Sequence, residues 1–206
     1  GRMSDDTGKQ RTAGAWAVGL RSLLLIEEQG QVFLSTGMPN GGCFWRYPEI
    51  IELLMCADHR RECLRQLPEK IRGRIRLPEI DREYTLYDVA TAMSAGPARA
   101  LGLSAKGHLG IGGDADIVIY EEDDSVVRMF SHPRYVIKAG EIVIEDGDIR
   151  ETPEGREFIV KPDYDPSTDK FIQPLFEDCY TMSFDNYPVE LERLERPDIQ
   201  SCGAVE

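Results

Sequence analysis

QVFLSTGMPNGGCFWRY, residues 31–47, passes from a short apolar segment into a loop rich in glycine. The segment Gln31–Ser35 carries an unbroken apolar run at its centre, which is typical of a strand that is buried on both faces. The loop Thr36–Gly42 follows at once, and its glycine, proline and asparagine residues are turn formers. Binding groups gather at the carboxyl ends of strands in α/β proteins, so this loop is the first candidate for a functional site.

The flanking sequence predicts helices on both sides of this strand. Ala15–Ile26 is rich in helix formers and apolar nearly all round, as expected of a helix that packs on two sides. After the loop, Glu49–Ala57 has an apolar face and follows Pro48, a residue that favours the first turn of a helix. Thr85 and Asp88 have the spacing of a capping box, so a further helix is expected to begin there.

Downstream of residue 105 the periodicity changes from helical to strand-like. Short apolar runs at 117–119, 126–127, 135–137, 142–144 and 158–160 predict closely spaced β-strands. Ala139-Gly140-Glu141, between two of these runs, is typical of a hairpin turn. The sequence then predicts one more helix over 165–180, broken at Pro174, and a charged tail after it.

Charge and cysteine content narrow the range of functions. The chain has 206 residues and a net charge of −13, which argues against nucleic acid or an anionic membrane as a partner. It has no apolar run approaching about 18 residues, so no transmembrane helix is expected. Its five cysteines are scattered and odd in number, which favours a reduced, cytoplasmic chain.

The block Tyr84–Gly147 resembles the carboxyl end of the amidohydrolase superfamily. Gly96–Leu103 (GPARALGL) is similar to the helix after the family's last barrel strand, and Lys106–Ile119 (KGHLGIGGDADIVI) is similar to the turn that follows. Tyr135–Ala139 and Glu141–Glu145 resemble a strand pair of the family's β-sandwich. The resemblance implies an α/β plus all-β fold, namely the C-terminal part of a (β/α)8 TIM-like barrel followed by a small β-sandwich domain.

This resemblance divides the chain into four expected parts. Residues 1–13 are a flexible lead-in, 14–104 the C-terminal portion of the barrel, 105–162 the β-sandwich, and 163–206 a C-terminal helix and tail. One strand and a few helices cannot close an eight-stranded barrel. The chain is therefore either the carboxyl portion of a longer protein or a shortened relative, and its apolar helix faces need cover from another chain or segment.

Three phrases in the same order resemble a narrower group, the A subunits of formylmethanofuran dehydrogenase and of the bacterial formyltransferase/hydrolase complex. They are Trp16–Leu20 (WAVGL), the loop region Ser35–Pro48, and Phe184–Val189 (FDNYPV). The resemblance implies a hetero-oligomer of one-carbon metabolism, with the other subunits of such a complex as partners. It also implies a pterin- or furan-type one-carbon carrier as substrate, whose N-formyl amine is converted to formate and amine with one or two Zn²⁺ ions.

At two positions the loop departs from the family pattern. The family's last barrel strand ends Thr-Asp-His-Pro-Asn-Gly, and its carboxylate binds metal and moves a proton. This chain has Gly37, which has no side chain, and Met38, whose thioether is a poor substitute for imidazole on zinc. The family's His-x-His pair is also missing, and His59, His108 and His132 are isolated. No catalytic or metal-binding residue is therefore assigned, and zinc is not expected to bind this chain alone.

Asn40, Arg46 and Tyr47 are the substrate-binding candidates. Asn40 either hydrogen-bonds a substrate carbonyl or simply forms the turn. Arg46 either pairs with a substrate carboxylate through its planar fork or is an ordinary surface residue. Tyr47, with Phe44 and Trp45 beside it, either lines a substrate wall or packs.

Cys56, His59 and Cys63 form a further cluster, because they lie three and four residues apart on a predicted helix. They would give zinc only three ligands in a segment rich in arginine, so ordinary helix packing is the favoured interpretation.

Two functional hypotheses follow. The first is an amidohydrolase-family subunit that acts on a non-peptide carbon–nitrogen bond, with its missing ligands supplied from elsewhere. The second is a non-catalytic scaffold that keeps the family's partner surfaces after losing the acid at the position of Gly37.

Overall fold

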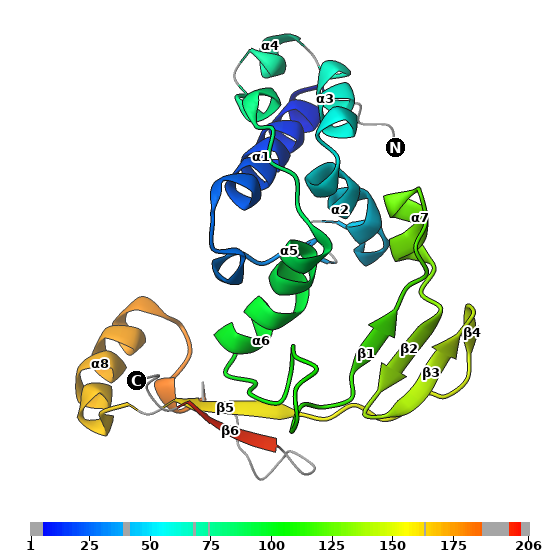
Figure 1. Cartoon of the computed structure of the whole chain (residues 1–206). Helices are drawn as coiled ribbons and strands as arrows, with labels where there is room; N and C mark the ends of the chain where they lie inside the picture. The colour runs from blue at the N-terminus through cyan, green and yellow to red at the C-terminus, as the bar shows by residue number, and fades with distance from the viewer. Residues whose placement is uncertain are drawn as a thin grey trace, which may run out of the picture. The chain divides into compact units, whose positions relative to one another are not determined.

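The computed structural model describes residues 6–38, 42–67, 69–73, 75–162, 164–186 and 198–202. The chain divides into two compact units. The first unit contains Gly1–Ala100 and Ser104–Thr152, and the second contains Leu101–Leu103 and Pro153–Glu206. Both are drawn in Figure 1. No helix within the described residues is both long and apolar enough to span a membrane.

The first unit begins with helices that are joined by short turns and ends in a small sheet (Figure 1). Its helical elements are α1 (Asp6–Leu25), η1 (Gln29–Gln31), η2 (Phe44–Arg46), α2 (Tyr47–Met55), α3 (Ala57–Arg65), α4 (Glu69–Arg72), η3 (Leu77–Glu79), α5 (Leu86–Ala90), the π-helical η4 (Thr91–Ala95), α6 (Gly96–Ala100) and α7 (Val126–Ser131). Its strands are β1 (Ile117–Ile119), β2 (Tyr135–Lys138), β3 (Glu141–Glu145) and β4 (Asp148–Ile149).

One face of α1 enters the core of this unit. Ala17, Leu20 and Leu24 are buried, and they belong to one hydrophobic cluster with residues of α2, α3, α5 and the π-helical segment. The opposite face stays open, because Val18 is 65% exposed and Trp16 is 44% exposed. A helix that is apolar nearly all round therefore buries only one side within the described residues. The helix also begins at Asp6, inside the expected lead-in.

An extended segment, residues 80–84, ties the helices together. The Tyr84 hydroxyl donates to the carbonyl of Leu23 at 2.7 Å, and the backbone N–H of Tyr84 donates to the carbonyl of Leu54 at 2.9 Å. The side chain of Arg82 donates to the carbonyl of Ile26 at 2.8 Å. These bonds satisfy carbonyls near the ends of α1 and α2, groups that a helix leaves without partners.

The strand predicted over Gln31–Ser35 is wrong. The end of η1 occupies Gln31, and the following residues are extended, with Val32 at φ −124° and ψ 138°. No strand among the described residues pairs with them. A strand requires hydrogen bonds to a neighbouring strand. An apolar run in the sequence does not show whether such a neighbour exists. The described residues by themselves contain no closed barrel.

The sheet of the first unit is an antiparallel meander in the order β1-β2-β3-β4. The predicted turn between β2 and β3 is confirmed: Ala139 and Gly140 both have positive φ, 51° and 87°. Asp146 and Gly147 repeat this pattern between β3 and β4, with φ values of 48° and 87°. Such two-residue turns match the twist of paired strands.

Two predictions for this region are corrected. The run Val126-Val127 begins the helix α7 rather than a strand, because Ser125 caps it: the Ser125 hydroxyl oxygen accepts from the N–H of Arg128 at 3.2 Å. The expected β-sandwich is also absent from the described residues, which place one four-stranded sheet here. The predicted strand at 158–160 exists, but it belongs to a different sheet in the second unit.

In the second unit, β5 (Phe158–Pro162) pairs in parallel with β6 (Asp198–Cys202). Residues 198–202, expected in the tail, therefore form a strand. The remaining elements are η5 (Pro166–Thr168), α8 (Asp169–Cys179) and η6 (Phe184–Asn186). The expected break at Pro174 is wrong, because α8 continues through it. Pro174 has no N–H to donate to the carbonyl of Lys170. Both residues are exposed, so this carbonyl lies on the solvent-facing side of the helix.

Lysines and aspartates hold the β2–β3 turn against the loop before β1. One carboxylate oxygen of Asp116 accepts from Lys138 at 2.6 Å and also from Lys106, and the other accepts from the N–H of Ala139 at 2.9 Å. Partial burial by itself raises the pKa of Asp116. The hydrogen bonds from the two lysines outweigh that effect and hold the pKa well below its ordinary value.

We expect Asp116→Asn to lower the free energy of unfolding at pH 7 by about 1–2 kcal/mol, because it removes charge-assisted bonds to two lysines. A depressed carboxylate pKa stabilises the fold above the unfolded pKa, and this contribution is lost as the pH falls. The difference in free energy of unfolding between parent and variant should therefore become smaller below about pH 4. Urea unfolding at several pH values measures it, with Asp124→Asn on the exposed surface as the control. A gap that does not depend on pH would contradict the assignment.

Candidate functional site

The candidate loop follows η1 and ends at the exposed η2, which leads directly into the core helix α2. Its two ends approach closely, since a Cβ added to Gly42 would lie 3.3 Å from the carbonyl oxygen of Thr36. Between them Gly37 has a φ of 67°, a left-handed conformation that glycine adopts without strain. The N–H of Gly37 donates to the hydroxyl oxygen of Ser35 at 3.2 Å. The conformation at this position is therefore set by the backbone and by a serine turn.

A close crossing of two glycines positions the segment that leads into this loop. Gly96, at the start of α6, lies against Phe33 and Gly30: a Cβ added to Gly96 would be 3.1 Å from the Phe33 ring and 3.3 Å from the Gly30 Cα. The helical run that contains Gly96 starts at Thr85, whose capping box with Asp88 is present as predicted. This contact was not predicted, although a glycine inside a helical pattern signals a close approach.

Asn40 lies outside the described residues, so its predicted role stays a prediction. Arg46 is paired within the chain: its Nη1 atom contacts both carboxylate oxygens of Glu49, at 2.6 and 2.5 Å. The hydrogen bond and charge of Glu49 raise the pKa of the Arg46 guanidinium. Tyr47 is half-buried at the first position of α2. The structure thus places Arg46 and Tyr47 side by side at the start of one helix.

Aromatic side chains beside Arg46 stay open to solvent. Phe44 and Trp45 form an edge-to-face pair, with ring centroids 5.3 Å apart. They are 59% and 61% exposed, so they do not pack into the core of the first unit. Met38 is 51% exposed in the same loop. The loop and η2 thus leave three large apolar side chains exposed, which makes this region a candidate contact surface.

The three histidines make local contacts. The Nδ1 atom of His108 accepts from the N–H of Gly110, so its other nitrogen is the one that donates to the carbonyl of Ser104 at 2.9 Å. His132 lies at the end of α7, with Nδ1 3.1 Å from the carbonyl oxygen of Arg128. His59 lies on α3, within reach of the Cys63 sulfur. His108 and His132 therefore bond within their own turn or helix end, and His59 contacts residues of α3 and α2.

The cluster of Cys56, His59 and Cys63 forms part of the junction between α2 and α3. The Cys56 sulfur accepts from the N–H of His59 at 3.4 Å and thereby caps α3. The Nε2 atom of His59 lies 3.4 Å from the Cys63 sulfur and 3.1 Å from a carboxylate oxygen of Glu52. Burial, with the charges of Glu52 and Glu62, raises the pKa of the Cys63 thiol. A raised pKa disfavours the thiolate that nucleophilic or metal-binding chemistry needs.

Zinc does not fit the residues present. Across the ranges that the structure describes, no group of three or more His, Cys, Asp or Glu side chains is placed to hold a metal ion. The loop itself offers Gly37 and Met38 where the family resemblance has a carboxylate and an imidazole. It therefore lacks the oxygen and nitrogen donors on which a hydrolytic zinc site depends.

Two proteins of known name are similar to this chain in sequence. The A subunit of the formyltransferase/hydrolase complex Fhc of Methylorubrum extorquens is 36% identical over 174 residues, which are 84% of this chain and 32% of that protein. Protein FwdA of Methanocaldococcus jannaschii is 37% identical over 189 residues, which are 86% of this chain and 33% of that protein. The chain thus spans about a third of the length of these relatives.

A solved structure is similar as well. It is the X-ray crystal structure of the formyltransferase/hydrolase complex (FhcABCD) from Methylorubrum extorquens in complex with methylofuran. One of its chains superposes with a TM-score of 0.74 at 33% identity, over 92% of this chain and 35% of that chain. The family model described as Amidohydrolase family matches residues 3–144, so this chain belongs to the amidohydrolase family.

Proposed function

We propose that this chain is the C-terminal part of a TIM-like barrel in an amidohydrolase-type subunit, within a hetero-oligomer of the formyltransferase/hydrolase kind. The substrate of that assembly would be the N-formyl amine of a furan- or pterin-type one-carbon carrier, and the reaction would release formate from it. The proposal is supported by the similar proteins and by the loop, whose turn and aromatic residues survive although its acid does not.

Within this proposal the chain shapes the mouth of the site and supplies no metal ligand. Arg46 and Tyr47 stand at the start of α2 beside the exposed Phe44–Trp45 pair, which supports a role as one wall of a substrate site. Asn40 is proposed as a further substrate contact from its place in the loop sequence alone. The guanidinium of Arg46 already holds one carboxylate, that of Glu49, in a two-oxygen contact. A carboxylate on a substrate would exchange with it and keep the same geometry.

The second candidate is a scaffold without catalysis, and the residue at position 37 favours it. Gly37 has no side chain with which to bind a metal ion or take a proton. The exposed apolar face of α1 supports an assembly role, because Trp16 and Val18 need cover from a further polypeptide. Both candidates place the chain in an assembly, and they differ in whether that assembly turns over a formamide.

Replacing Arg46 tests whether this wall touches substrate. In the native assembly we expect Arg46→Gln to raise KM for a carboxylate-bearing N-formyl amine about threefold to tenfold while kcat changes little, because ground-state binding is lost. Steady-state kinetics of formate release measures it. Arg128→Gln is the matched control, since Arg128 forms a similar exposed ion pair with Asp123. Turnover with the same KM in both variants would contradict the substrate role, and absence of turnover in the parent would leave only the scaffold.

A further inference from the structure

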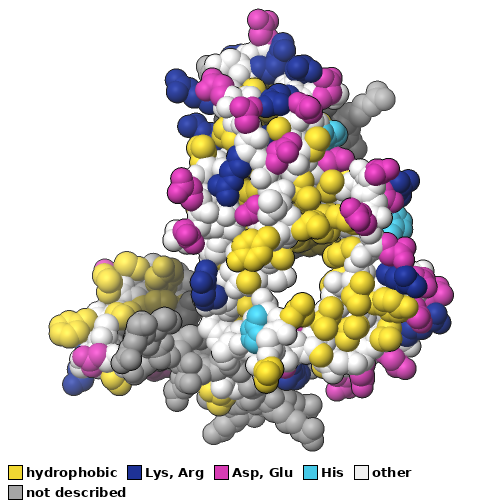
Figure 2. All heavy atoms as spheres, viewed as in Figure 1, with side chains coloured by type: hydrophobic (Ala, Val, Ile, Leu, Met, Phe, Trp, Pro, Cys, Tyr) yellow, Lys and Arg dark blue, Asp and Glu magenta, His cyan; other side chains and the backbone are white. Residues whose placement is uncertain are grey.

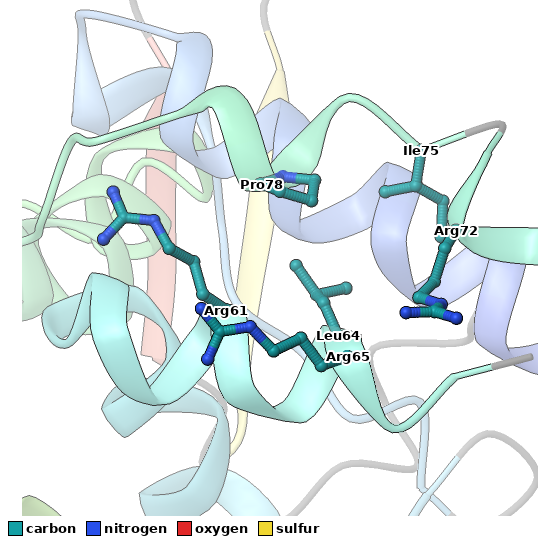
Figure 3. A pocket seen from close by; sticks show the side chains of 6 residues that line it. All are labelled: Arg61, Leu64, Arg65, Arg72, Ile75 and Pro78. Carbon is teal, nitrogen blue, oxygen red and sulfur yellow. The ribbon is translucent and has the colours of Figure 1, made fainter. Parts of the chain in front are cut away.

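A small pocket lies between α3, α4 and η3, away from the loop region in sequence. Its volume is about 260 Å³, and it is lined by Arg61, Leu64, Arg65, Arg72, Ile75 and Pro78. Figure 3 shows Leu64 pointing toward Pro78, with Arg61 and Arg65 on one side of the pocket and Arg72 on the other. Apolar side chains therefore form the middle of the pocket, and cations stand around it.

This pocket lies in the most basic segment of an acidic chain. Residues 60–76 contain seven of the 24 lysines and arginines but only two of the 37 acidic residues. Figure 2 shows Lys and Arg side chains over α3 and α4, with Asp and Glu side chains between them. In a chain with a net charge of −13, such a local concentration of cations favours an anionic partner at this site alone.

The three arginines differ in how they are compensated. Arg61 donates to Asp58 at 2.8 Å and also to Asp81, and Arg65 donates to Glu62 at 2.8 Å. Arg72 has no ion pair or side-chain hydrogen bond within the described residues. Arg61 and Arg65 thus already bind carboxylates. Arg72, across the apolar floor of the pocket, binds none within the described residues. The donor that remains for a ligand is the guanidinium of Arg72, supplemented by Arg65.

We propose that this pocket binds an acidic peptide segment of a protein partner. A carboxylate of the segment pairs with Arg72, and an apolar side chain beside it packs on Leu64, Ile75 and Pro78. The guanidinium fork can match a carboxylate in two parallel hydrogen bonds. Arg61 and Arg65 already bind carboxylates of the chain itself, through single contacts to Asp58 and Glu62. This interaction surface does not depend on the proposed reaction.

The size and lining of the pocket argue for a peptide over other anions. A volume of about 260 Å³ lies below the range typical of small-molecule sites and suits one or two side chains. Inorganic phosphate would gain nothing from the apolar floor. Nucleic acid needs an extended basic surface, which the acidic remainder of the chain opposes. An apolar anchor flanked by carboxylates uses both parts of the lining.

Fluorescence anisotropy tests this with the full chain in its native assembly. The probe is a fluorescein-labelled peptide in which glutamates flank a single leucine. We expect Arg72→Gln and Arg65→Gln each to weaken its binding by about fivefold. Arg76→Gln should change it less than about twofold. Arg76 is the matched control, because it is exposed in the same basic segment but does not line the pocket.

Two altered peptides complete the test. A peptide with glutamine for glutamate, and one with serine for leucine, should both bind more weakly than the probe if carboxylates and floor act together. Undetectable binding of the probe to the parent, or equal binding by parent and Arg72→Gln, would overturn the proposal. Displacement of the probe by inorganic phosphate at similar concentration would indicate a simple anion site. Stronger competition by duplex DNA would indicate a nucleic-acid surface, and either result overturns it.

Discussion

Replacing Arg60 with alanine should destabilise the first unit by about 3–5 kcal/mol. This side chain is only 1% exposed, although it is an arginine. Its guanidinium donates to the carbonyl of Leu53 at 2.7 Å, and to those of Ile80 and Arg82 at 2.9 Å each. The substitution would leave three carbonyls without donors and open a cavity where the side chain was.

The loss of stability in Arg60→Ala is limited, because burying the guanidinium of Arg60 itself costs free energy that the substitution recovers. Its Nε atom is buried without a hydrogen-bond partner among the described residues, and burial lowers the pKa of the guanidinium. Arg60→Lys should fall between parent and alanine, because one ammonium cannot reach all three carbonyls. Arg61→Ala is the neighbouring control and should cost less than about 1 kcal/mol, since its ion pairs involve exposed partners. Urea unfolding measures all three, and equal losses at positions 60 and 61 would contradict this account.

Replacing Gly107 with alanine should cost about 3 kcal/mol. Gly107 has a φ of 76°, and a Cβ there would lie 2.8 Å from both the Ser94 carbonyl oxygen and the Ala98 Cβ. These atoms belong to η4 and α6 and have little freedom to move. Strain in the backbone and a collision with the helix would therefore add together.

Gly112 separates these two effects. It has a φ of 87°, but a Cβ there would have nothing within 4 Å. Gly112→Ala should therefore cost only the left-handed strain, about 1 kcal/mol. Thermal unfolding measures the loss of stability in each variant, and the difference between the two losses is the cost of the collision. Equal losses would show that the turn at Gly107 does not press on the helix.

The helices were predictable because their information is local. The capping box of Thr85 and Asp88 and the apolar face of α2 both appear in the structure as the sequence predicts. The hairpin at Ala139-Gly140 was predictable for the same reason, since turn chemistry acts over two residues. Where an element's conformation depends on neighbours in sequence, residue pattern was sufficient.

Elements that depend on distant partners were predicted less well. The apolar run after Gln31 looks like a buried strand, but a strand also needs a neighbour to pair with, and pattern alone does not supply one. The error at Val126-Val127 has a local cause instead: the β-branched residues suggested a strand, while the preceding Ser125 caps a helix. The buried role of Arg60 was equally hidden, because its partners are carbonyls up to 22 residues away.

The sequence was sufficient to locate the candidate loop and to show that ligand residues are missing from it. Gly37 and Met38 already indicated in the sequence that a carboxylate and an imidazole were missing. What the sequence could not supply was the contact of Gly96 with Phe33, which sets the direction of the segment entering the loop.

Zinc content of the native assembly, measured together with formamide hydrolysis, tests whether this chain shapes a site without supplying its metal ligands or acid. We expect the purified parent assembly to hold no zinc attributable to this chain and to keep its partner subunits bound. Gly37→Asp is the comparison, since it restores a carboxylate at the position where the family resemblance has one. Stoichiometric zinc together with turnover in the parent assembly, lost when Gly37 or Met38 is changed, would contradict the claim.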